Sequence, residues 1–194
     1  MRFITIVSLL LWMGCKPISV QIESTDSYFD LPGFSQKILV SQIKAKSKVL
    51  KTIQVNAIEE QNNLLADSLF WATELSPLLK GNLNKPSLAD GYSVQKDISE
   101  QSSNLLKTVY TALPETHTSI TSLEIKYLGT DTEVRQIVAQ FESKNSVYTT
   151  EQVVQLWINK YGNQLLIDSI STQGFNKTIL LDSMKYYSKV VVIR

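Results

Sequence analysis

The single histidine of the chain, His117, is the first residue to test for chemistry. In a serine hydrolase it would act as the general base, with Glu115 or Asp131 orienting its ring. The Gly-x-Ser-x-Gly turn that exposes a nucleophilic serine does not occur in the sequence. We therefore expect His117 to be a turn residue at the entrance of a strand.

Two pairs of acidic residues, Glu59-Glu60 and Asp131 with Glu133, could be imagined as the acid and base of a glycosidase. That reaction needs two carboxylates facing each other across a cleft at roughly 5–10 Å, which neighbours on a loop rarely do. We interpret them as solvated loop charges.

A zinc site needs three or four nitrogen or sulfur ligands, and the chain has one histidine and one cysteine. We expect no enzyme, no metal site and no cofactor.

Aromatic residues are concentrated in the part of the chain that we expect to form strands. Strand propensity and cross-strand packing are the ordinary reasons for finding aromatic residues there. The alternative is an aromatic-lined concave face that holds a lipid, a glycan or a peptide. The candidate binding surface consists of Tyr127, Tyr148, Trp157 and Tyr186.

The only cysteine, Cys15, follows Met1-Arg2, an apolar run over residues 3–13 and Gly14. A short positive region followed by about eleven apolar residues is the layout of a secretory signal, and a membrane-spanning helix needs roughly 20. The segment resembles the lipobox of bacterial lipoproteins, with Trp12 where a leucine is usual. In that family the cysteine thiol receives a diacylglyceryl group and a peptidase cuts before it. The resemblance implies lipidation at Cys15 and attachment to a membrane.

This interpretation divides the chain into a signal peptide (1–14), a lipidated cysteine with a tether (15–27) and one domain (28–194). Removing residues 1–14 from the 194 leaves 180 residues, enough for one domain without disulfides. The signal carries one of the 19 basic residues, so 18 remain against 18 acidic ones. A neutral chain argues against nucleic acid as a partner.

Two helices are expected in the first part of the domain. The first covers residues 31–46, with Asp30 as its N-cap and Pro32 in its first turn. A strand over residues 48–58 follows. The second helix begins after an Asp67 cap and ends near residue 79, and residues 82–91 form a loop.

From residue 92 onward, apolar residues recur at every second position, as in half-buried strands. We predict an α+β fold in which two helices pack on an antiparallel β-meander sheet, with Trp71 and Phe70 between them. In the fifth of these strands, Trp157 lies on the opposite face from its apolar neighbours. The expected strands cover residues 92–98, 104–112, 120–128, 133–142, 147–159, 164–172 and 185–193, with turns at 129–131 and 161–163.

Most of residues 15–194 resembles an uncharacterised group of small lipoproteins from the Bacteroidota. The resemblance implies the lipid anchor and no activity. It rests on Tyr28-Phe29-Asp30-Leu31 with Phe34, on Trp71-Ala72 with Glu74-Leu75, on Asn84-Lys85-Pro86, and on Ser146-Val147-Tyr148-Thr149.

The function expected from these features is that of a membrane-anchored cell-envelope lipoprotein acting as a non-enzymatic binding or accessory module. The alternative is a carrier or chaperone for a lipid or another hydrophobic ligand, resembling in architecture the lipoprotein-sorting factors with a curved sheet closed by helices. Its partners are the membrane, through the acyl chains, and a protein or hydrophobic ligand. Because Lys16-Pro17-Ile18 rather than acidic residues follow Cys15, we expect a periplasm-facing domain on the bacterial outer membrane.

Overall fold

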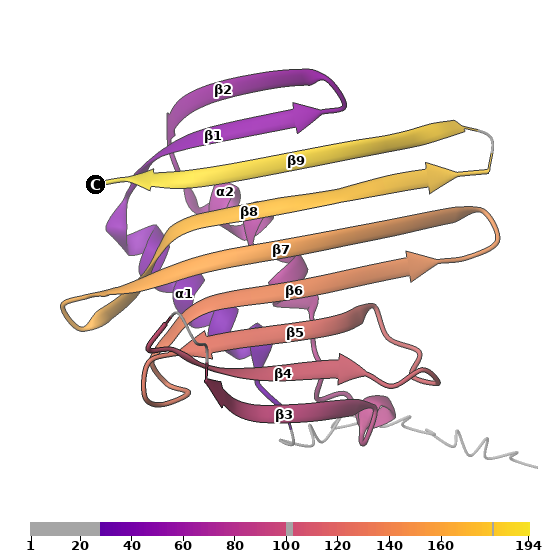
Figure 1. Ribbon diagram of the computed structural model, residues 1–194. Coiled ribbons are helices and arrows are strands. Elements are labelled where there is room, and N and C mark those ends of the chain that lie inside the picture. Colours follow the sequence, from indigo (N-terminus) through magenta and orange to yellow (C-terminus); the bar gives the residue numbers. More distant parts are fainter. Residues whose placement is uncertain (1–27, 100–102, 180) are drawn as a thin grey trace, which may run out of the picture.

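The computed structural model describes residues 28–99, 103–179 and 181–194, so the predicted signal peptide (1–14) and tether (15–27) lie outside the described residues. Figure 1 shows one large sheet with the helices behind it. The elements are α1 (Leu31–Ala45), β1 (Lys48–Val55), β2 (Ile58–Leu65), α2 (Ser68–Glu74), α3 (Ser76–Lys80), a 3₁₀ turn η1 (Pro86–Leu88), β3 (Tyr92–Ser99), β4 (Leu106–Ala112), β5 (Ile120–Tyr127), β6 (Val134–Lys144), β7 (Tyr148–Tyr161), β8 (Gln164–Thr178) and β9 (Leu181–Ile193).

All nine described strands belong to one antiparallel sheet, in the order β2-β1-β9-β8-β7-β6-β5-β4-β3. Strands β3 to β9 form the expected meander, and their turns fall at the predicted places, with Gly129 and Gly162 at positive φ. The hairpin β1–β2 joins the last strand rather than the first of the meander. The fold is therefore mainly β, with a larger sheet than the predicted two-helix α+β arrangement (Figure 1).

The expected single strand over residues 48–58 is wrong, because the chain turns at Asn56-Ala57 and returns as β2. Asn56 adopts φ 53°, which asparagine tolerates better than most residues. It also exchanges hydrogen bonds with the backbone of Lys185: its N–H donates to the carbonyl at 2.9 Å, and its Oδ1 accepts from the N–H at 3.1 Å. Apolar alternation runs through the turn, so periodicity alone did not reveal it.

The predicted second helix is two helices, because the chain kinks at Leu75 between α2 and α3. Pro77 has no N–H to donate and therefore occupies the first turn of a new helix rather than the interior of a continuous one. Both predicted N-caps are confirmed. Asp30 accepts from the N–H of Gly33 at 2.9 Å, and Asp67 accepts from that of Phe70 at 2.7 Å.

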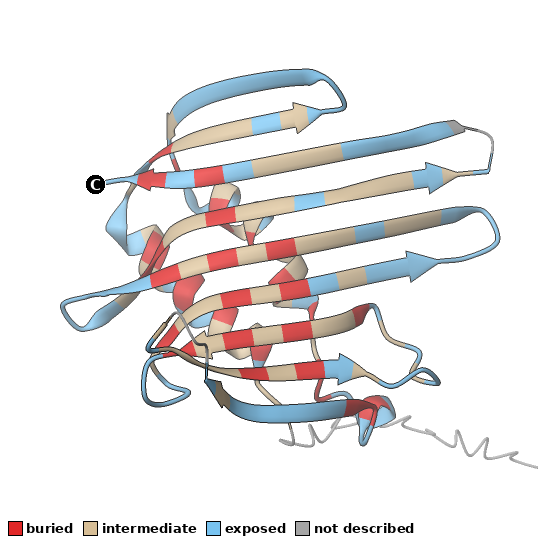
Figure 2. Cartoon of the chain, viewed as in Figure 1, coloured by how far each residue is buried: buried red, intermediate tan, exposed pale blue. Residues whose placement is uncertain are grey.

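The core lies between the helices and one face of the sheet. Trp71 is fully buried there, as predicted, and the ring of Phe70 packs edge-on against it at 5.3 Å between centroids. Figure 2 shows the buried residues on the part of the strands backed by helices, whereas the far ends of β6 to β9 are intermediate or exposed. The other fully buried large side chains are Leu31, Leu75, Leu78, Leu83, Ile120, Leu123, Ile125, Ile137, Leu156, Ile167 and Ile170.

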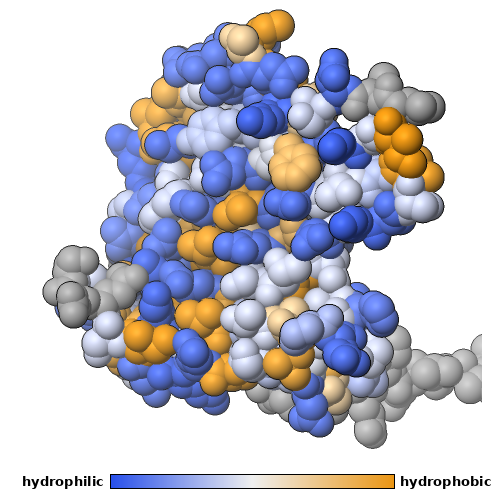
Figure 3. Space-filling model, turned by 45° about the vertical axis from the view of Figure 1, so that its right-hand side comes forward, coloured by the Kyte–Doolittle hydropathy of each residue, from blue (hydrophilic) through white to orange (hydrophobic). Residues whose placement is uncertain are grey.

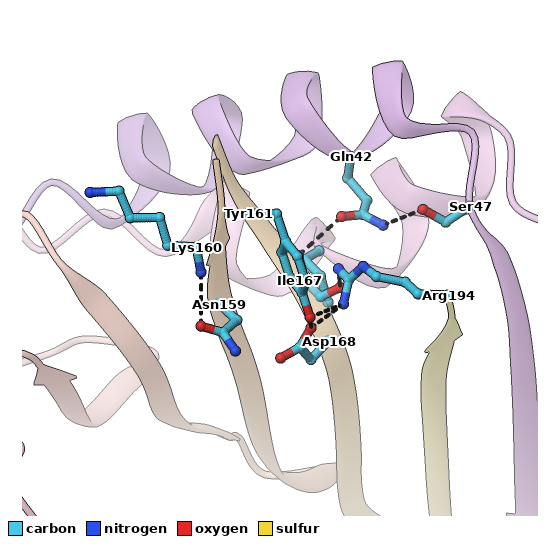
Figure 4. A network of polar contacts seen from close by, with 8 residues as sticks. All are labelled: Gln42, Ser47, Asn159, Lys160, Tyr161, Ile167, Asp168 and Arg194. Atoms are coloured by element: carbon cyan, nitrogen blue, oxygen red, sulfur yellow. Dashed lines mark hydrogen bonds and ion pairs between the residues drawn. The ribbon is translucent and has the colours of Figure 1, made fainter. Parts of the chain in front are cut away.

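Helix α1 is tied to the sheet by Gln42, whose side chain is fully buried (Figure 4). Its Oε1 accepts from the N–H of Ile167 at 3.0 Å, and its Nε2 donates to Ser47 Oγ at 3.1 Å. Nearby, Asp168 on β8 and the ring of Tyr161 at the end of β7 hold the side chain of Arg194. These contacts fix α1 and the end of the chain on β8.

Candidate ligand-binding site

The four aromatic residues of the candidate binding surface do not lie together. Tyr127 is on the helix-side face and is only 4% exposed, whereas Tyr148 is 40% exposed near the far end of β7. Tyr186 faces the helix side as well, over Gly174. Trp157 is half-buried on the opposite, open face of the sheet, between two buried neighbours, as the sequence predicts.

The open face carries mixed side chains. Figure 3 shows hydrophobic residues there as separate patches among hydrophilic ones. A shallow groove of about 430 Å³ at the ends of β7 to β9 includes Phe175 and Tyr187 in its lining. His117 is exposed in the segment before β5 and lines none of the grooves described here. The open face therefore does not gather the predicted aromatic residues into one site.

Tyrosines instead cluster on the helix-side face, where the beginning of α1 meets strands β3 to β5. The ring of Tyr28 packs edge-on against Tyr92 at 5.4 Å and against Tyr110 at 5.9 Å between centroids. The backbone N–H of Tyr92 donates to the Tyr28 hydroxyl at 3.3 Å. Tyr92 on β3, Tyr110 on β4 and Tyr127 on β5 all lie on the helix-side face of the sheet, because alternate residues of a strand share a face. Three neighbouring strands therefore contribute to the cluster.

At the rim of this cluster, Tyr127 donates a hydrogen bond of 2.5 Å to Asp97 Oδ1. The register of β3 shifts between Gln95 and Ile98, as in a β-bulge, and Asp97 has φ 56°. Bulges re-aim side chains and occur beside functional sites, and left-handed backbone in a residue other than glycine is uncommon. The bulge thus turns the Asp97 carboxylate towards a buried phenol.

Burial raises the pKa of three of these tyrosines, Tyr92, Tyr110 and Tyr127. Burial raises the pKa of Tyr127, and the hydrogen bond to Asp97 raises it further, whereas Thr108 at 3.2 Å lowers it. Burial likewise raises the pKa of Tyr110, against the effect of a hydrogen bond with the backbone of Phe29. Both phenols are therefore protonated donors at neutral pH.

A groove of about 560 Å³ opens over this cluster; we call it the tyrosine groove. Two carboxylates, Asp97 and Asp131, and one amine, Lys96, belong to its lining, so acidic side chains outnumber basic ones. The remaining lining residues are Tyr28, Phe29, Thr108, Tyr110, Ile125, Tyr127, Gly129 and Thr130.

A second groove of about 570 Å³ adjoins the first along α1; we call it the phenylalanine groove. Phe29 and Asp131 line both grooves. The rings of Phe29 and Phe34 are 5.4 Å apart between centroids, and Ile38 and Leu165 add apolar surface. A polar, hydroxyl-rich groove and a more apolar one therefore meet at a shared wall.

Of the four candidate aromatic residues, Tyr127 lines the tyrosine groove, whereas sequence reasoning missed Asp97, Tyr110 and Phe29. Asp131 was considered only as a residue orienting His117 and as a partner of Glu133, and the structure separates the roles of the two acidic residues. Asp131 lines both grooves, whereas Glu133 forms ion pairs with Lys160 at 2.6 Å and Arg135 at 3.1 Å. Hydrogen bonding to Lys160 is the main cause that lowers the pKa of Glu133.

The other acidic pair, Glu59-Glu60, is exposed on strand β2 rather than on a loop. Within the part of the chain that the structure describes, no three histidine, cysteine or acidic side chains cluster as metal ligands would. None of the described helices combines the length and apolarity needed to cross a membrane.

Comparisons with family models, with curated proteins and with solved structures found no match to the chain.

Proposed function

We propose that this protein is a lipid-anchored, non-enzymatic binding protein of the bacterial cell envelope, and that it binds an amphiphilic ligand. One observation carries the proposal: the tyrosine groove and the phenylalanine groove share Phe29 and Asp131. A ligand lying across that wall places its polar head among hydroxyls and carboxylates, and its apolar tail along Phe34 and Ile38.

The polar head is uncharged and rich in hydroxyl groups. The Tyr110 hydroxyl can donate a hydrogen bond to the ligand, whereas Tyr127 already donates its single proton to Asp97. The carboxylates of Asp97 and Asp131 accept hydrogen bonds from ligand hydroxyls. Two carboxylates against the single amine of Lys96 disfavour an anionic head. Of the tyrosines that line the groove, Tyr110 and Tyr127 are buried, and the half-buried Tyr28 is the ring that can meet the C–H side of a sugar, so a glycosyl head fits the groove best.

The packing of the core argues that the ligand binds at the rim and not between the layers. Trp71, Leu75 and Leu78 are fully buried between helices and sheet, where a carrier with an enclosed cavity would hold its ligand. The grooves instead lie outside the core, at the beginning of α1. A surface binding module is therefore better supported than the carrier alternative.

The lipid anchor would keep this site near a membrane. The described chain begins at Tyr28, which lines the tyrosine groove. Residues 16–27 can reach on the order of 40 Å from Cys15 when extended, at about 3.3 Å per residue. An amphiphile in the outer membrane would then be within range of a periplasm-facing domain.

Calorimetric titration tests the ligand class. The unlipidated Cys15→Ser chain is titrated with octyl glucoside below its micelle-forming concentration, with glucose and with octanoate. We expect the glucoside to bind at least about tenfold more tightly than either fragment, a difference of about 1.4 kcal/mol. Octanoate binding as tightly as the glucoside would overturn the assignment of the head, and no binding of any probe would overturn the site.

Substitutions then locate the binding. Asp97→Asn in the tyrosine groove and Phe34→Ser in the phenylalanine groove should each weaken glucoside binding about tenfold or more. The matched control is Tyr187→Phe, which removes a tyrosine hydroxyl from the groove on the open face. Equal weakening by all three variants would show that the glucoside binds elsewhere or nonspecifically.

A further inference from the structure

The two outer strands of the sheet, β2 and β3, differ in how their free edges are protected. An exposed edge presents unpaired N–H and C=O groups to other chains, and proteins protect it with bulges, lysine or proline. Strand β3 has the bulge at Asp97 and the neighbouring Lys96. Strand β2 pairs with β1 without a register shift and contains neither lysine, proline nor glycine. Among the described residues no strand pairs with the outer edge of β2, whose only charged side chains are Glu59 and Glu60, so this edge is open to a further strand.

Exposed apolar side chains collect at this same edge. Ile58 is 70% exposed, Leu65 64% and Leu69, at the start of α2, 72%. A groove of about 350 Å³ runs between β2 and α2, and Leu64, Leu65, Leu69 and Phe70 belong to its lining. A strand added to β2 would therefore find an apolar groove beside the hydrogen-bonding edge.

The sequence of β2 suits pairing with itself. A closed antiparallel pair of identical edges has a twofold axis normal to the sheet, so one residue lies opposite its own copy. With Gln61 on that axis, Glu60 faces Asn62 of the second copy and Glu59 faces Asn63. Ile58 then faces Leu64 of the second copy, at the rim of the groove. The Ile58–Leu64 pair is apolar, and in each of the other pairs a carboxylate or an amide faces an amide.

Neighbouring registers are worse. With Glu60 on the axis, two like charges lie directly opposite each other, which is destabilising. With Asn62 on the axis, Glu60 faces Leu64 and Glu59 faces Leu65, so two carboxylates are set against apolar side chains. The charge pattern therefore favours a single register.

We propose that the protein forms a dimer in which β2 pairs with β2 of a second copy, antiparallel and centred on Gln61. The pairing joins two nine-stranded sheets at their edges and places Ile58 of each copy at the β2–α2 groove of the other. In Figure 1 this edge lies at the opposite end of the sheet from β3. The dimer leaves the tyrosine groove open, and the proposal is independent of the ligand.

Sedimentation of the full chain, purified in detergent, measures the dimerisation. The wild-type protein should be a dimer at micromolar concentration. Gln61→Lys puts two lysines opposite each other on the axis and should raise the dimer dissociation constant at least tenfold. The matched control is Asn63→Lys, two residues away on the same face and equally exposed, which lies opposite Leu50 in its own copy, faces Glu59 of the second copy and should leave the dimer intact or tighter.

A crosslink tests the register separately. Cysteine at position 61 faces itself, so Gln61→Cys should give a covalent dimer on oxidation, whereas Asn62→Cys should not at the same rate. A wild-type monomer at all concentrations would overturn the proposal and leave the edge to a strand of another protein. Equal weakening by the two lysine variants, or equal crosslinking at both positions, would overturn the register.

Discussion

Trp71 and Trp157 separate structural from surface roles at the scale of single residues. Trp71 is fully buried between α2 and the sheet, and Trp157 is half-buried on the open face. Trp71→Ala should lower the free energy of unfolding by about 3–5 kcal/mol, the usual range for deleting a large buried aromatic side chain. Trp157→Ala should cost about 1 kcal/mol, as is common for substitutions outside the core.

Urea denaturation of the two variants measures both values. A large loss at Trp157 together with a small loss at Trp71 would mean that the faces of the sheet have been assigned the wrong way round.

Tyr127 predicts a loss of stability in alkali. Its pKa in the folded protein is raised above the unfolded value of about 10, so folding favours the neutral phenol. This contribution is complete below pH 10 and is lost as the pH rises through the folded pKa. Tyr127→Phe should therefore show a smaller fall in stability above pH 10 than the wild type.

Urea denaturation between pH 8 and pH 11 checks this, with Tyr148→Phe at the exposed end of β7 as the control. An unchanged alkaline profile in Tyr127→Phe would contradict a pKa of Tyr127 raised by burial and by the hydrogen bond to Asp97.

At the scale of elements, the attachment of α1 depends on one buried amide. Gln42→Ala leaves the N–H of Ile167 without its acceptor inside the structure. An unsatisfied buried donor costs about 1–3 kcal/mol, and thermal unfolding should show a loss of at least that size. Gln140→Ala, at an exposed position on β6, is the control and should change stability by less than about 0.5 kcal/mol. Equal effects would mean that Gln42 contributes no specific hydrogen bond.

At the scale of the whole molecule, the lipid at Cys15 is expected to be the attachment to the membrane. Cys15→Ser removes the thiol that would be acylated, and burial of acyl chains contributes about 0.8 kcal/mol per CH₂. The variant should leave the membrane fraction and keep the thermal unfolding profile of the wild type. Retention of the variant in membranes after a salt wash would contradict the anchor.

The domain is expected to face the periplasm. Protease added to intact cells should then leave the wild-type domain uncut.

The sequence by itself determined the elements whose causes are local. Asp30 and Asp67 cap helices because their side chains bond to N–H groups three residues away. Gly129 and Gly162 mark turns because they reach positive φ at little cost. Alternation located the seven strands of the meander, since every second side chain meets the core. The hairpin at Asn56 was missed because the apolar alternation of β1 continues through Ala57, and because β2 is polar over residues 59–63 and shows no alternation of its own.

Only the tertiary structure decided the site. Tyr28 and Tyr92 are 64 positions apart, and Asp97 and Tyr127 are 30 apart. No periodicity within one strand relates such residues. The bulge in β3, the order of the strands and the docking of α1 bring them together, and each of these depends on contacts between distant segments. The wall shared by Phe29 and Asp131 exists for the same reason: it joins the beginning of α1 to the turn between β5 and β6.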